Sequence, residues 1–211
     1  MITDKIQIDS KGAGLEQALK ETERFCAYQQ MNERETRRMR LLAEETILML
    51  QELATHFSGE FWLESEPEKK CSLVVDVSTL MTDGNRQELL GVSTSGKNLL
   101  RKGVMGKIGA FFDLGLSQTA YLPDKAGVMD YGILSSELAF AADPTTVGGL
   151  MWSLQSYRDK IGAEADRSDE APEISEAWDE LQRSIIANLA DDVQVGIRGG
   201  RVKMIVSRTP R

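Results

Sequence analysis

The sequence contains few of the residues that build metal centres and nucleophilic sites. In 211 residues there is one histidine, His56, and there are two cysteines, Cys26 and Cys71. Zinc sites need clustered ligands, which a single histidine does not supply; a place at the end of a helix, where a cation is favoured, explains His56 better than catalysis. The cysteines form no C-x-x-C pair, which favours two reduced thiols in a cytosolic protein. No G-x-S-x-G motif is present, so no serine-hydrolase site is predicted.

Long apolar runs and an excess of basic residues are also missing. No apolar run approaches the roughly 18 residues that a membrane-spanning helix needs. Residues 1–12 lack the apolar segment of a secretory signal. The formal net charge is −8, whereas nucleic-acid binding requires clustered cations that neutralise phosphates. We therefore expect a cytoplasmic protein that binds neither membranes nor nucleic acids.

The composition that remains is that of a globular domain. Hydrophobic residues make up 41% of the chain and charged residues 27%, as in ordinary soluble domains. A chain of this length can bury a substantial core. We therefore treat residues 1–211 as a single domain.

Hydrophobic periodicity predicts five elements in the first 80 residues. They are a strand at 5–10, a helix from 15 to about 30, a long helix from 33 that stops at Gly59, and strands at 60–66 and 71–80. Asn32 with Glu35 three positions later is a capping-box arrangement, which marks the start of the long helix. The middle of that helix is apolar around much of its circumference, so it is expected to be a buried central helix.

After residue 80 the sequence pattern predicts fewer elements clearly. Glycines punctuate residues 84–109, a helix is expected at 107–122, and residues 121–150 are consistent with a helix and a turn. Further predictions are helices at 150–161 and 174–190 and a closing hairpin of strands at 192–197 and 201–206. The acidic stretch at 163–180 is typical of a solvated linker leading into a helix start, with the linker placed at 163–176. Strands separated by helices that cover one face predict an α+β fold, a two-layer sandwich with a mixed sheet.

One stretch has the spacing of a phosphate-binding loop. Gly91, Gly96 and Lys97 match G-x-x-x-x-G-K, but Asn98 stands where the motif requires serine or threonine. The loop also needs a buried strand before it, and the preceding residues have a helical composition. We interpret the match as coincidental.

The long helix and the hairpin carry a resemblance to a known family. The segment "RRMRLLAEETILMLQELATHF", followed by a hairpin that ends in "LVVDVST", resembles the histidine-kinase-like (GHKL) ATPase domain, in particular the anti-sigma-factor serine kinases. The closing segment "LQRSIIANLADDVQVGIRGGRVKMIVSR" is similar to the last helix and strands of that family. The resemblance covers roughly residues 14–80 and 178–208 and implies a Bergerat-like fold, with residues 82–165 as an insertion.

The resemblance also implies site residues. It assigns the catalytic acidic position to Glu44 or Glu45 and the adenine-binding position to Asp76. Ser78 stands where the first glycine of the family's D-x-G-x-G motif would contact the nucleotide, and a side chain there narrows the pocket. The magnesium-binding asparagine four positions after the acidic residue is absent, so the cofactor is expected to be either none or ATP, without magnesium.

Two readings of these residues stay open. The glutamates could instead be solvated or paired with the arginines that precede them at positions 37, 38 and 40, and Asp76 could be an ordinary turn residue. Two functions follow from the resemblance. One is a regulatory module that binds a protein partner and has lost ATPase chemistry, which the missing metal ligand favours. The alternative is a divergent ATP-binding serine kinase or anti-sigma-type regulator. An enzyme of unrelated chemistry is a third option.

Overall fold

The computed structural model describes part of the chain and divides it into two compact units. The described residues are 1–54, 56–67, 70–79, 133–135, 150–165, 181, 184–198 and 200–210. The first unit comprises Met1–Thr79, Ile185–Val193 and Arg201–Arg211; the second comprises Leu80–Ser184 and Gln194–Gly200.

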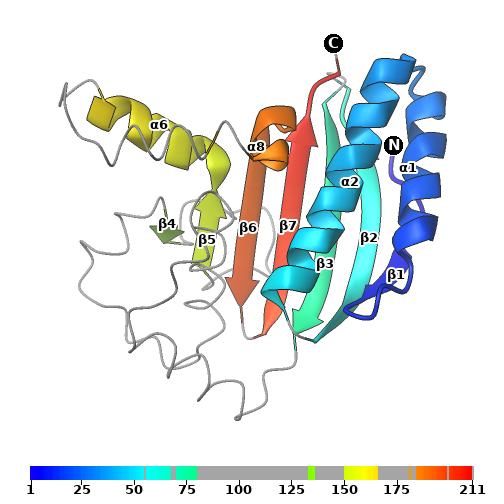
Figure 1. Cartoon of the computed structure of the whole chain (residues 1–211), viewed down its shortest axis with the longest axis horizontal. Helices are drawn as coiled ribbons and strands as arrows, with labels where there is room; N and C mark the ends of the chain where they lie inside the picture. Colours follow the sequence, from blue (N-terminus) through cyan, green and yellow to red (C-terminus); the bar gives the residue numbers. More distant parts are fainter. Residues whose placement is uncertain are drawn as a thin grey trace. The chain divides into compact units, whose positions relative to one another are not determined.

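Four antiparallel strands form the sheet of the first unit. They are β1 (Ile6–Asp9), β2 (Phe57–Ser65), β3 (Cys71–Thr79) and β7 (Arg201–Arg208). β2 pairs with β1 and β3, and β3 pairs with β7. Helices α1 (Leu15–Tyr28) and α2 (Glu33–Leu53) lie against one face of these strands (Figure 1). The short helix α8 (Ile185–Leu189) packs against α2.

Four described elements lie wholly or mostly in the second unit. They are β4 (Ile133–Ser135), β5 (Leu150–Ser153), most of β6 (Asp192–Arg198) and helix α6 (Leu154–Ala165). β5 pairs antiparallel with β4 and with β6. The strand order is β1-β2-β3-β7 within the first unit and β6-β5-β4 in the strands of the second. These elements confirm the predicted α+β class. The expected mixed sheet is corrected, because the five pairings described are all antiparallel.

The start of α1 depends on a glycine. Gly14 caps the helix with φ 79°, in the left-handed region that side chains disfavour. A Cβ added there would lie 1.9 Å from the carbonyl oxygen of Gln7 in β1. The chain therefore turns from β1 into α1 through a contact that only glycine allows, and α1 follows directly beside the strand.

The start of α2 confirms half of the predicted capping box. The Asn32 side chain accepts a hydrogen bond from the Glu35 backbone N–H at 2.9 Å, which satisfies one of the free donors of the first turn. The Glu35 side chain does not complete the box. It is buried and bound to arginines, as described below.

Helix α2 is amphipathic rather than buried on all sides, which corrects the prediction. Its buried side carries eight residues: Glu35, Met39, Leu42, Ala43, Thr46, Ile47, Met49 and Leu50. Leu41 and Leu48 are 37% and 38% exposed on the other side. The helix covers one face of a sheet, so only one side of it meets the core.

Two predicted boundaries are also wrong. The helix predicted to continue to Gly59 ends at Leu53, and β2 begins at Phe57, because Phe57–Gly59 pair with the end of β3. The helix predicted at 150–161 begins only at Leu154, since Leu150–Ser153 pair with β6 as a strand. In both cases sheet pairing overrides local helical periodicity.

Several predictions lie outside the described residues. They are the phosphate-loop-like stretch 91–98, the helix at 107–122, the linker at 163–176 beyond residue 165, and the first part of the helix at 174–190. Within 121–150, the described residues 133–135 form a strand, not a helix. The single domain stays a prediction.

Candidate functional site

Asp76, the predicted adenine contact, lies in an ion pair. Both of its carboxylate oxygens accept hydrogen bonds from the Arg201 guanidinium, at 2.7 Å from Nε and 2.7 Å from Nη2. Two parallel bonds of this kind give a strong, well-oriented pair. The Asp76 side chain is only 14% exposed, whereas Arg201 is 55% exposed. β3 continues to Thr79, so Asp76 is an interior residue of the strand and not a turn residue at its end.

The sheet separates Asp76 from α2. Paired residues of adjacent strands share a face, and successive residues along a strand alternate between faces. Val75 pairs with Met204 and shares its face. Arg208 lies an even number of residues after Met204 in β7 and therefore faces the same side, where it binds Glu35 of α2. Val75 therefore faces the helices and Asp76 faces the opposite side.

The predicted catalytic glutamates lie on α2. Glu44 and Glu45 are both half-buried on the helix side of the sheet. An Arg40 nitrogen lies 4.0 Å from a Glu44 oxygen, but Arg40 makes its shorter ion pair, at 2.8 Å, with Glu23 of α1. The structure thus brings neither glutamate together with Asp76, nor with Ser78, which shares the face of Asp76 and is exposed.

The position expected to hold the metal-binding asparagine has two alternatives. If Glu44 is the acidic residue, the position is Leu48, which is 38% exposed; if Glu45 is, the position is Met49, which is 2% exposed. Neither side chain offers an oxygen ligand of the kind that magnesium prefers. Within the described ranges, no three His, Cys, Asp or Glu side chains are grouped as a metal site would require.

The sheet face around Asp76 is charged and internally paired. Glu60, directly opposite Asp76 in the register, accepts from Lys5 Nζ at 2.7 Å and from Gln7 Nε2 at 3.3 Å. The hydrogen bond from Lys5 lowers the pKa of Glu60. Lys5 also lies 4.6 Å from the centre of the Trp62 ring, a cation–π geometry. The Lys5 ammonium thus favours the ionised form of Glu60, which does not suit a general acid, and both Asp76 oxygens are occupied by Arg201.

Sequence reasoning missed a buried charge cluster under α2. Glu35 is 2% exposed. One oxygen accepts from Arg208 Nε at 3.0 Å and Nη2 at 2.9 Å, and the other accepts from Arg38 Nη1 at 2.5 Å. Arg208 also donates to the backbone carbonyl of Leu189, at the end of α8. The cluster ties the start of α2, the end of α8 and the end of β7 together.

Electrostatics keep Glu35 ionised. Burial alone raises the pKa of its carboxyl, but the hydrogen bonds from Arg208 and Arg38 outweigh burial, so the pKa lies below its ordinary value. The signal available in the sequence was a glutamate at the third position of a helix. That position is also a capping-box position, so burial could not be distinguished from capping.

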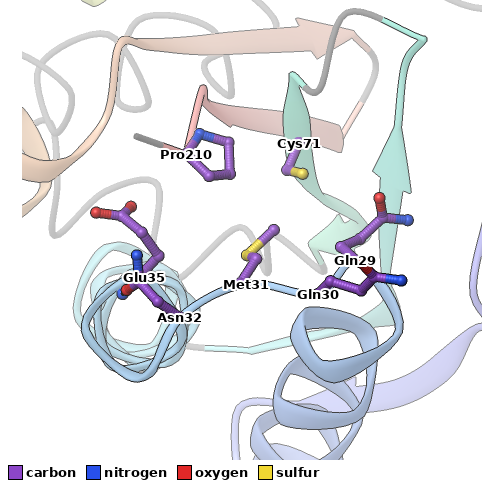
Figure 2. Close-up of a pocket in the computed structure, with 7 residues that line it drawn as sticks. All are labelled: Gln29, Gln30, Met31, Asn32, Glu35, Cys71 and Pro210. Atoms are coloured by element: carbon purple, nitrogen blue, oxygen red, sulfur yellow. The ribbon is translucent and has the colours of Figure 1, made fainter.

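A pocket of about 210 Å³ lies next to this cluster. It is lined by Gln29, Gln30, Met31, Asn32, Glu35, Cys71 and Pro210. Figure 2 shows Met31 central among them, with Cys71 and Pro210 on the sheet side and Glu35 and Asn32 on the α2 side. Burial raises the pKa of the Cys71 thiol to about 11, which makes it a poor nucleophile. The Glu35 carboxylate is already occupied by two arginines.

Comparison with known proteins adds no family. No protein-family model, curated protein or solved structure matches this chain significantly. No helix in the described part of the chain is long and apolar enough to cross a membrane.

Proposed function

We propose that this chain is a regulatory module that binds a protein partner, built on a histidine-kinase-like fold that has lost ATPase chemistry. The observation that carries the proposal is the placement of Asp76. Its carboxylate is occupied by Arg201 on the sheet face opposite α2, so it is separated from Glu44 and Glu45.

A nucleotide site of the implied kind needs these groups on one side of the sheet. The adenine contact and the acidic residue would have to reach the same bound nucleotide, and the phosphates would need a metal to neutralise their charge. The residue at the asparagine position is Leu48 or Met49, and both are apolar. These features favour a binding function over the alternative, an ATP-binding serine kinase.

A thermal-shift titration with ATP and magnesium tests the proposal. Mass action gives about 2.7 kcal/mol of stabilisation at a hundredfold excess over the dissociation constant. We expect no rise in melting temperature with any nucleotide, in the wild type or in Asp76→Ala.

A matched variant makes the experiment sharper. Arg201→Ala removes the ion pair of Asp76 without changing α2. The Asp76 carboxylate is then available to accept a hydrogen bond from adenine. A nucleotide-dependent rise in the wild type that Asp76→Ala abolishes would favour the kinase. A rise only in Arg201→Ala would mean that the ion pair alone blocks a nucleotide site.

A further inference from the structure

We draw no further inference here: the strongest candidate, the pocket of about 210 Å³ at the turn between α1 and α2, rests on the N-terminus of α2 and the lone thiol of Cys71, and since two arginines already bind its buried carboxylate, Glu35, nothing in the described part of the chain indicates a ligand.

Discussion

Replacing Glu35 with glutamine removes the negative charge of the buried cluster while preserving its shape. Arg208 is then left with a neutral partner although its side chain is only 8% exposed. Breaking a buried ion pair by changing one member costs about 3–5 kcal/mol. The remaining amide oxygen still accepts a hydrogen bond, so we take the lower end, about 3 kcal/mol. With a urea m-value of about 2 kcal/mol per molar, the unfolding midpoint should fall by about 1.5 M.

The pH dependence has a definite sign. The pKa of Glu35 is lower in the folded protein than its ordinary value of 4.5, so the unfolded chain binds the proton more readily. Its stabilising contribution is fully present above about pH 4.5 and is lost as the pH falls through the folded pKa. Urea unfolding at a series of pH values should therefore show a steeper acid loss in the wild type than in Glu35→Gln.

A matched control lies in the same turn of α2. Glu33→Gln removes a carboxylate from the same first turn, but its ion pair with Arg37 is exposed, so stability should change by no more than about 0.5 kcal/mol. If Glu35→Gln unfolds at the same urea concentration as Glu33→Gln, or if both variants keep the acid dependence of the wild type, the cluster does not stabilise the fold as argued.

Three further predictions concern the helices and the thiols. Gly14→Ala should destabilise the protein by more than about 2 kcal/mol in urea unfolding, because its Cβ would lie 1.9 Å from the Gln7 carbonyl oxygen; a loss below about 0.5 kcal/mol would show that the turn adapts. Asn32→Ala should cost about 1 kcal/mol through the lost helix cap, whereas Asn32→Asp should cost little, and equal losses would exclude capping as the cause. Burial raises the pKa of the Cys26 and Cys71 thiols to about 12 and about 11, so a thiol reagent at pH 8 should modify both rapidly only after unfolding; fast modification of the native protein would contradict their burial.

The elements whose signals are local could be predicted from the sequence. The helix cap at Asn32 and the hairpin of β2 and β3 depend on short-range features, a capping side chain and β-branched residues around a turn. The structure confirms both. The prediction of a helix at Leu150 is wrong because its strand partner, Ile197, lies far along the chain. Phe57 lies at the open end of the hairpin, where its partner Thr79 is far from the turn that the local signal marks.

The placement of Asp76 could not be predicted for a related reason. Val74 and Val75 are both buried, at 2% and 1% exposed, so the run in β3 shows no alternation that would reveal which face meets the helices. The register with β7 decides it. Glu35 was missed in the same way, since its partner Arg208 lies 173 positions away.

The central claim of the proposal is that this chain has lost the nucleotide site that the resemblance implies, and calorimetric titration of ATP with magnesium tests it most directly. The account predicts no saturable heat up to millimolar ATP, in the wild type and in Asp76→Ala alike. Saturable binding at one site, weakened at least about tenfold by Asp76→Ala, would contradict it.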